Sequence, residues 1–323
     1  MTEQPRPPAP GPQPHGPQPV TAPLCAVILA AGEGRRLRPL TDLRPKALCP
    51  VGNVALLDHA LHRVAGLGLG GPHRVAVNAS YLGEQVVAHV GGRARLSVEP
   101  DGPRGTGGGV AALRDWIAGR GVLVGNADAY LSTPGAAPGD DIAALLAGWD
   151  GERVRILGRP AGPGERHEFG TFRFAGFSLL PWRYVAALPA GPGELVHSVW
   201  RPAEAAGALD VVPYAGTYLD TGTPADYLAA NLHAAARAGT GTGDGDGDGD
   251  GDGDGDGDGN LIHPDAVVTG GCRAAVVGAG AVVDGWAHRA VVWPGGRVAA
   301  GERLADAIRV GDDLTVAAGS PLA

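Results

Sequence analysis

The chain has 323 residues, 44% of them hydrophobic, which is enough for two domains with a sizeable core. Its formal net charge of −8 equals the eight aspartates of one Gly-Asp tract between residues 239 and 259, so the rest of the chain is neutral on this count. The three cysteines (Cys25, Cys49 and Cys272) form no C-x-x-C pair, and the longest apolar run, residues 24–31, is too short for a membrane span. These features exclude a disulfide scaffold and a membrane-spanning protein, and we expect a cytoplasmic protein with no nucleic-acid partner.

Two segments lack the apolar residues that a folded core requires. Residues 1–23 contain nine prolines and no apolar h-region, which predicts a disordered tail and not a signal peptide. Residues 239–259 are little more than Gly-Asp repeats, and because a calcium β-roll needs regular apolar residues, we interpret this tract as a solvated linker. The two segments leave a main domain at residues 24–238 and a C-terminal domain at residues 260–323.

In the main domain, short apolar runs alternate with segments whose apolar residues recur at helical spacing. This alternation predicts an α/β fold, Rossmann-like, with a mostly parallel sheet and helices on both faces. His59 and His62, three residues apart, are interpreted as a solvated helix face and not as a metal pair. The expected strands are residues 24–29, 74–78, 95–99 and 121–128, and the expected helices are residues 54–68, 81–90 and 108–119.

Segments rich in glycine and polar residues follow these four strands. In sheets of this kind, ligands bind outside the carboxyl ends of the strands, so we expect the segments to converge on one binding edge. They are AAGEGRR after the first strand, residues 78–80, residues 99–106 and residues 126–128.

The remainder of the main domain is less regular. Residues 170–180 look like a strand with Gly176 inside it, where a ligand or another backbone can approach closely. Further on, a strand leads to Asp220 and then to a helix opened by Thr223 as N-cap and Pro224 as first residue. Beyond the linker, Val and Gly recur at roughly six-residue spacing, which indicates a small β domain of β-helical coils that leans on a partner surface.

A small-residue loop follows the first strand. Ala30, Ala31, Gly32 and Gly34 leave backbone N–H groups open to a phosphate. A dinucleotide fingerprint needs a third glycine where this chain has Leu37, and the Gly-Lys-Ser/Thr ending of a Walker A loop is missing. The loop therefore favours a phosphate-binding site of another kind.

Cations cluster just after this loop. Arg35, Arg36 and Arg38 are followed by Lys46, which is the one lysine among 26 basic residues. Lysine offers a compact charge on a flexible stem, whereas arginine offers a rigid fork. The contrast indicates a site where a phosphate is held while its geometry changes, and several cations beside a glycine loop suit a triphosphate.

The run LAAGEGRRLRPLTDLRPKAL at residues 29–48 resembles the signature of the sugar-1-phosphate nucleotidylyltransferases, L-x-x-G-x-G-x-R-L-x-P-L-T followed by P-K-x-L. The resemblance is nearest to mannose-1-phosphate guanylyltransferases and their close bacterial relatives. The C-terminal domain is similar to the degenerate left-handed β-helix that many members carry. Weaker matches occur in the family's order at NASYL (78–82), GTGGGVAAL (105–113), GNAD (125–128), FAGF (174–177) and YLDTGTPADYL (218–228).

The resemblance implies that the phosphate oxygen of a sugar 1-phosphate attacks the α-phosphorus of a nucleoside triphosphate, GTP being the first expectation, and that pyrophosphate leaves. It implies Arg36, Lys46 and Asp128 as catalytic residues, with Mg²⁺ held by Asp128 and Asp220 and with the sugar close to Gly176. The implied nucleotide-binding residues are Ala30, Ala31, Gly32, Gly34, Arg36, Asn78, Gly105 and Thr106.

Some readings stay open. Asp220 could instead cap the turn before Pro224, and Glu168 and Glu194 are weaker candidates for contact with the sugar. Ala127 stands where the family has a glycine, and no Glu-Lys-Pro segment is found near residues 150–170, so the chain matches the family's pattern more fully on the triphosphate side than on the sugar side. The alternatives are a uridylyl- or thymidylyltransferase, a non-catalytic regulatory homologue, or a nicotinamide or flavin oxidoreductase; the oligomeric state, a homo-oligomer included, is open.

Overall fold

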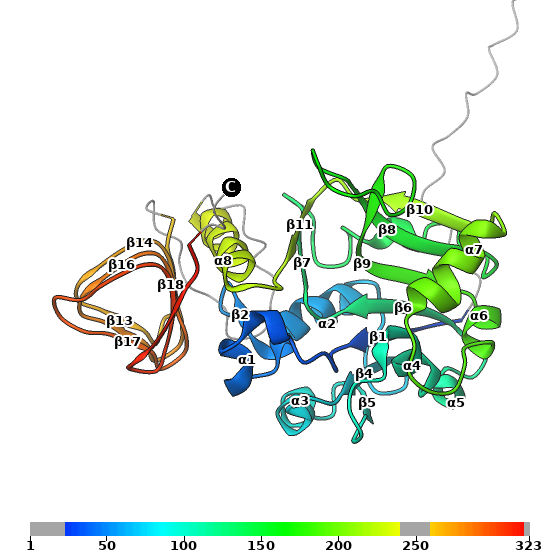
Figure 1. Ribbon diagram of the computed structural model, residues 1–323, viewed down its shortest axis with the longest axis horizontal. Helices are drawn as coiled ribbons and strands as arrows, with labels where there is room; N and C mark the ends of the chain where they lie inside the picture. Colours follow the sequence, from blue (N-terminus) through cyan, green and yellow to red (C-terminus); the bar gives the residue numbers. More distant parts are fainter. Residues whose placement is uncertain (1–22, 240–258, 320–323) are drawn as a thin grey trace, which may run out of the picture.

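The computed structural model describes residues 23–239 and 259–319. The predicted disordered tail and the predicted Gly-Asp linker lie almost wholly outside the described residues. Figure 1 shows a larger unit built on a sheet and a smaller stack of strands, with helix α8 (Pro224–Gly239) between them. In the part of the chain that is described, no helix has both the length and the apolar character needed to cross a membrane.

A seven-stranded sheet forms the centre of the larger unit. The fourth predicted strand ends at Asn126. The strand at residues 172–180 runs antiparallel to both of its neighbours, β6 (Gly121–Asn126) and β8 (Val154–Pro160). All other neighbours in this sheet pair in parallel, which confirms the predicted mostly parallel sheet. In spatial order the strands are β10 (Leu209–Pro213), β8 (Val154–Pro160), β9 (Phe172–Leu180), β6 (Gly121–Asn126), β1 (Leu24–Leu29), β4 (Val75–Ala79) and β5 (Arg95–Val98).

Helices pack on both faces of the sheet, as predicted. Side chains of β1 alternate between the faces: Ala26 and Ile28 belong to one buried cluster, Cys25 and Val27 to the other. Because β1 is covered on both sides, its sequence is a continuous apolar run. The first cluster includes α2 (Leu56–Gly66), α3 (Gly83–Val90) and η3 (Ala143–Leu145); the second includes α4 (Gly105–Ala111), α5 (Arg114–Ile117), α6 (Trp182–Ala186), η4 (Val196–Trp200) and α7 (Arg201–Ala205).

The single helix predicted at residues 108–119 is wrong, because two short helices, α4 and α5, occupy this region. The first begins at Gly105 and lies against the backbone of residues 191–193. A Cβ on Gly108 would come 2.6 Å from the Gly191 carbonyl oxygen, so only glycine permits this approach. The glycines thus start the helix earlier than its apolar spacing suggests.

The C-terminal unit is a stack of coils. Ala274, Arg289 and Asp306 lie at equivalent levels of three parallel strands and have φ of 50°, 47° and 46°, so each strand turns a corner there. The repeated corner and the parallel pairing confirm the predicted small β domain; its left-handed sense stays a prediction. The long strands are β14 (Gly271–Val277), β16 (Trp286–Val292) and β18 (Arg303–Val310), and β13 (Val267–Val268), β15 (Val282–Val283) and β17 (Arg297–Val298) form a second sheet.

The coils pack against the larger unit of the same chain, which provides the surface that the sequence predicted they would lean on. Helix α8 contacts β14, β16 and β18, and one buried cluster joins residues of the larger unit, such as Leu40 and Leu56, to Val276, Val291 and Ile308 of the coils. The remaining elements are η1 (Arg35–Leu37), α1 (Leu40–Leu43), η2 (Lys46–Leu48), β2 (Pro50–Val51), β3 (Val54–Ala55), β7 (Ala129–Ser132), β11 (Thr217–Asp220), β12 (Leu261–Ile262) and β19 (Leu314–Ala317).

Candidate active site

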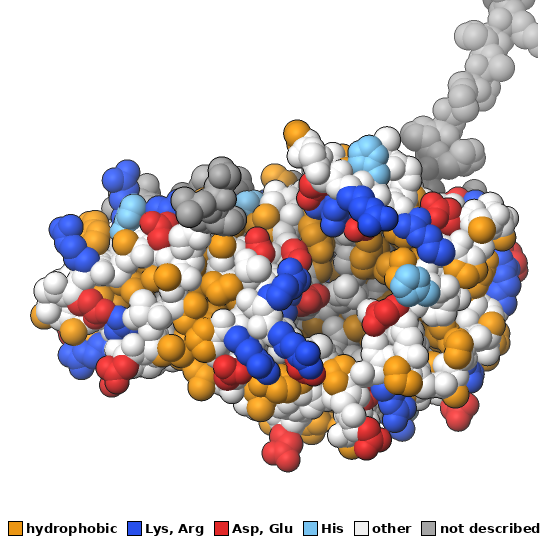
Figure 2. Space-filling view, in the orientation of Figure 1, with side chains coloured by type: hydrophobic (Ala, Val, Ile, Leu, Met, Phe, Trp, Pro, Cys, Tyr) orange, Lys and Arg blue, Asp and Glu red, His pale blue; other side chains and the backbone are white. Residues whose placement is uncertain are grey.

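A cleft of about 450 Å³ lies at the carboxyl ends of β1, β4 and β6, where the segments after the strands were expected to converge. Figure 2 shows a hollow in this face of the larger unit, with Lys, Arg, Asp and Glu side chains along its edge. All predicted nucleotide-binding residues line the cleft, as do Lys46 and Asp128. The lining residues are Leu29, Ala30, Ala31, Gly32, Gly34, Arg35, Arg36, Lys46, Ala47, Asn78, Pro103, Gly105, Thr106, Asn126, Ala127, Asp128, Glu194 and Gly222.

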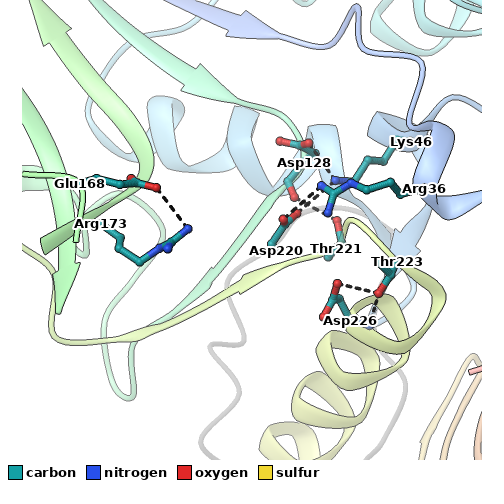
Figure 3. A network of polar contacts seen from close by, with 9 residues as sticks. All are labelled: Arg36, Lys46, Asp128, Glu168, Arg173, Asp220, Thr221, Thr223 and Asp226. Carbon is teal, nitrogen blue, oxygen red and sulfur yellow. Dashed lines mark hydrogen bonds and ion pairs between the residues drawn. The ribbon is translucent and has the colours of Figure 1, made fainter. Parts of the chain in front are cut away.

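Lys46 joins the two aspartates that the sequence singled out. Its Nζ donates to Asp128 Oδ2 at 2.8 Å and to Asp220 Oδ1 at 3.4 Å, and Figure 3 shows the three side chains converging. The Lys46 side chain is 8% exposed, whereas both carboxylates are nearly half exposed. A largely buried lysine side chain therefore stands at the floor of the cleft, in contact with two half-exposed carboxylates.

The backbone brings these aspartates together by a short two-stranded sheet. β7 and β11 pair antiparallel, so that Asp220 lies opposite Ala129, the residue after Asp128. The Thr221 hydroxyl donates to the Asp128 carbonyl oxygen at 3.0 Å and closes the end of the ladder. Thr223, and not Asp220, caps α8, because its Oγ1 accepts from the Asp226 N–H at 3.2 Å. The Asp220 carboxylate is therefore not used in the cap, and it contacts Lys46 and Arg36 at the border of the cleft.

Of the three arginines after the glycine loop, Arg36 alone turns to these aspartates. Arg35 pairs with Glu33 at 2.5 Å and Arg38 pairs with Asp42 at 3.1 Å. Arg36 Nη2 lies 3.5 Å from Asp220 Oδ2, and its side chain is 68% exposed. The exposed guanidinium remains available to a phosphate entering the cleft.

Gly34 lies directly behind Lys46. Its φ is +62°, and a Cβ there would come 2.9 Å from Thr41 Cγ2 and 3.0 Å from Lys46 Cβ. The Thr41 hydroxyl donates to the Gly34 carbonyl oxygen at 3.0 Å. Glycine is therefore required both by the left-handed backbone and by the close approach of the lysine stem.

Asn78 is almost fully buried and holds the loop in place. Its Oδ1 accepts from the Ala30 N–H at 2.7 Å, and its Nδ2 donates to Glu99 Oε1 at 2.8 Å. The other oxygen of Glu99, also buried, accepts from the Arg104 N–H at 2.8 Å. Asn78 thus has a positioning task, and its contact with the nucleotide stays a prediction. Sequence reasoning missed the task of Glu99, whose only signal was its place after β5.

Thr106 is tied to Glu194. The Thr106 N–H and hydroxyl donate to Glu194 Oε2 at 3.2 and 2.6 Å, and the hydroxyl accepts from the Leu195 N–H at 2.8 Å. Glu194 closes one wall of the cleft. Because Gly105 has φ +73° and a Cβ there would meet Glu194 Oε1 at 2.5 Å, glycine is needed at this position too.

Gly176, the predicted sugar-side residue, does not line the cleft. It has φ +83°, and a Cβ on it would lie 2.6 Å from Ala129 Cβ, so its lack of a side chain serves the contact between β9 and β7. Its contact with a sugar stays a prediction. Glu168 pairs with Arg173 at 3.2 Å, apart from the Lys46 group (Figure 3).

The donor set suits a hard divalent cation that also binds phosphate. Asp128 and Asp220 both reach Lys46 Nζ, so both carboxylates lie within reach of one shared point. Among residues 23–239 and 259–319, no three His, Cys, Asp or Glu side chains gather into a complete ligand set. Two carboxylates completed by phosphate oxygens are the pattern typical of Mg²⁺. Burial raises the pKa of Tyr218, and the negative charges of Asp128 and Asp220 raise it further.

Fold and site together define an α/β protein with a glycine-bordered cleft at the carboxyl edge of its sheet, beside a cluster of opposite charges. Comparison with known proteins agrees. The model of a family described as the MobA-like NTP transferase domain matches residues 26–210. The chain belongs to this family, in the group of the sugar-1-phosphate nucleotidylyltransferases.

Individual relatives differ in base and sugar. The chain is 31% identical over 246 residues to an N-acetylmuramate alpha-1-phosphate uridylyltransferase of Caulobacter vibrioides, covering 66% of this chain and 98% of that protein. It is 30% identical over 150 residues to a mannose-1-phosphate guanylyltransferase of Mycobacterium tuberculosis, covering 45% of this chain and 39% of that protein. A crystal structure assigned to a glucose-1-phosphate thymidylyltransferase of Bacillus anthracis shares the fold, with 17% identity, a TM-score of 0.54, and coverage of 65% of this chain and 95% of that one.

Proposed function

We propose that the protein transfers a nucleotidyl group from a nucleoside triphosphate to a sugar 1-phosphate, with UTP as the preferred nucleotide. The observation that carries this proposal is the contact of the single lysine with both aspartates in a cleft bordered by a glycine loop. Such a site suits phosphate chemistry, where positioning and charge stabilisation matter more than covalent help.

The reaction joins two anions. A phosphate oxygen of the sugar 1-phosphate forms a bond to the α-phosphorus of the nucleotide, and the bond from that phosphorus to the oxygen bridging it to the β-phosphate breaks as pyrophosphate leaves. Lys46, at the floor of the cleft, would contact the phosphates where they meet, and Arg36, at its edge, would hold the triphosphate. Open backbone N–H groups near Gly32 and Gly34 would orient the triphosphate.

Asp128 and Asp220 would hold Mg²⁺ in this proposal. When bound, the ion supplies charge neutralisation at the phosphates and polarises their oxygens. The chain itself orients the carboxylates through β7, β11 and Thr221.

The choice of UTP rests on the breadth of one match. The relative that aligns over 98% of its own length is a uridylyltransferase, whereas the guanylyltransferase aligns over 39%. This support shifts the preference away from GTP, the first expectation from sequence. N-acetylmuramate 1-phosphate is accordingly the first sugar to test and mannose 1-phosphate the second.

A pyrophosphate-release screen tests the proposal. Four nucleoside triphosphates are combined with N-acetylmuramate, N-acetylglucosamine, glucose and mannose 1-phosphates, with Mg²⁺ and with EDTA, and products are identified by mass. We expect pyrophosphate release with UTP that needs both Mg²⁺ and a sugar 1-phosphate. An Asp128→Asn variant is the matched negative control and should release none. Turnover with GTP alone would overturn the choice of base, and folded protein that turns over no pair would overturn the proposed activity.

A further inference from the structure

The segment that carries Lys46, residues 44–50, is contacted by the coils and by α8. The uridylyltransferase relative is covered almost completely by 66% of this chain, so about a third of this chain has no counterpart in it. We therefore asked how the coils contact the segment that carries Lys46. One of their residues, Trp293, which directly follows β16, contacts one end of the Lys46 segment and reaches the other end through Tyr227.

The first end is Arg44, two residues before Lys46. Its guanidinium carbon lies 5.0 Å from the centroid of the Trp293 ring, in a cation–π stack. Trp293 is 3% exposed, so the stack is formed on a fixed surface. Among the described residues, no acidic partner is found for Arg44, which leaves the stack as its recorded side-chain contact.

The second end is Pro50, four residues after Lys46. Trp293 Nε1 donates to the Tyr227 hydroxyl at 3.0 Å, and that hydroxyl in turn donates to the Pro50 carbonyl oxygen. Tyr227 is fully buried, and its ring meets the indole edge-on with centroids 6.5 Å apart. Asn231 lies one helical turn after Tyr227 in α8, and its Oδ1 accepts from the Gly52 N–H at 3.0 Å, close to Pro50 in the chain.

We infer that Trp293 is a positioning residue for Lys46: it holds Arg44 directly and Pro50 through Tyr227 of α8, and so fixes the position of the ammonium in the cleft. The inference rests on the proposed function only for its catalytic consequence. Between these two ends, both Cys49 and Lys46 are buried, so we expect the loss of either contact to move the lysine stem. The coils therefore help to position a catalytic residue, in addition to packing against the larger unit.

The test uses full-length variants of matched chemistry. Trp293→Phe keeps a ring for Arg44 but loses the N–H donor, and Tyr227→Phe removes the bridging hydroxyl. Trp293→Ala removes both the ring under Arg44 and the donor to Tyr227. Trp286→Ala is the control, because Trp286 lies in the same coil but is 41% exposed. Circular dichroism and melting curves establish that each variant is folded at the assay temperature.

We expect kcat to fall on the order of tenfold in Trp293→Ala and by a smaller factor in the two Phe variants, with the nucleotide KM little changed, because a misplaced charge contact costs the transition state most. The control should keep the wild-type kcat. Folded Phe variants with wild-type kcat would overturn the inference, and so would an equal loss in Trp286→Ala.

A second readout does not need activity. Because Lys46 is the only lysine, its acetylation by acetic anhydride can be followed on one peptide by mass spectrometry. We expect Lys46 to react at least twofold faster in the Trp293 and Tyr227 variants than in wild type and in Trp286→Ala; equal rates would overturn the inference. If wild-type protein released no pyrophosphate, the proposed function would fail while this arm still decided whether Trp293 positions Lys46.

Discussion

At the scale of single residues, the site depends on the difference between an ammonium and a guanidinium. Lys46 reaches two carboxylate oxygens from beneath Gly34, in a space where a Cβ on that glycine would already be too close. An arginine fork is wider and rigid, so it cannot occupy the same point between Asp128 and Asp220. The remaining 25 basic residues of the chain are all arginines, so the lysine at this position is an exception in the chain's composition.

Replacing Lys46 by Arg should therefore lower kcat by on the order of 10²-fold, because a transition-state charge contact is displaced. The melting temperature should stay close to that of wild type, since the charge is kept. Steady-state pyrophosphate release measures the effect, with Arg38→Lys as a control at an exposed pair outside the cleft. A Lys46→Arg enzyme with wild-type turnover would remove Lys46 from the chemistry.

Much of the residue-level site was predictable because it lies in one continuous signature. Gly32, Gly34, Arg36 and Lys46 are close in sequence, and all four line the cleft. The tasks of Glu99 and Gly222 were not predictable. Glu99 acts through a buried hydrogen bond to Asn78, and a Cβ on Gly222 would meet the Arg36 guanidinium at 2.6 Å; both depend on three-dimensional contacts across long sequence separations.

At the scale of elements, α2 shows how a regular pattern can mislead. Its period predicted a solvated face for His59 and His62, and His62 is exposed, but His59 is partly buried. The His59 ring Nε2 contacts the Val51 carbonyl oxygen at 2.9 Å, across to β2, and the Tyr130 ring lies 5.6 Å away. A helical period defines a face, whereas the partner of that face is set by neighbouring elements.

Burial, and next the positive charge of Arg63, lower the pKa of His59 from 6.5 to about 4. Between these values the unfolded chain binds a proton that the folded protein does not, so the free energy of unfolding falls as the pH is lowered from 6.5 towards 4. We expect a loss of about 2 kcal/mol at pH 5 from this residue, at ~1.4 kcal/mol per pH unit. Urea unfolding at pH 7, 6 and 5 measures it. A His59→Gln variant should lack this part of the pH dependence; identical slopes in both proteins would contradict the assignment.

At the scale of the whole molecule, the sheet unit and the coils share one buried cluster. Leu37 and Leu40, which follow the glycine loop, belong to it together with Trp293 and Ile308. Sequence patterns predicted both units, because a βα alternation and a coil repeat are local signals. The docking between them could not be predicted, since it depends on which side chains of α8 face the coils.

Because the docking is made by folded elements, the Gly-Asp tract should matter little for activity. We expect a chain with every second Gly-Asp pair of residues 244–259 removed to keep specific activity within about twofold, since the free energy of loop closure changes by only ~0.6 kcal/mol when the length of a connection is halved. Pyrophosphate release and melting curves on the shortened chain check this. An activity loss comparable to that of Trp293→Ala, in a folded protein, would show that the tract has a task of its own.

The most direct test of the central claim is the protection of Lys46 by bound nucleotide. Acetylation of this single lysine is measured on the peptide that contains it, with and without the triphosphate selected by the screen and Mg²⁺, at saturation established by calorimetry. We expect the bound nucleotide to slow acetylation at least tenfold, because its phosphates cover the ammonium between Asp128 and Asp220. An unchanged acetylation rate at saturation would place the phosphates elsewhere and contradict the account.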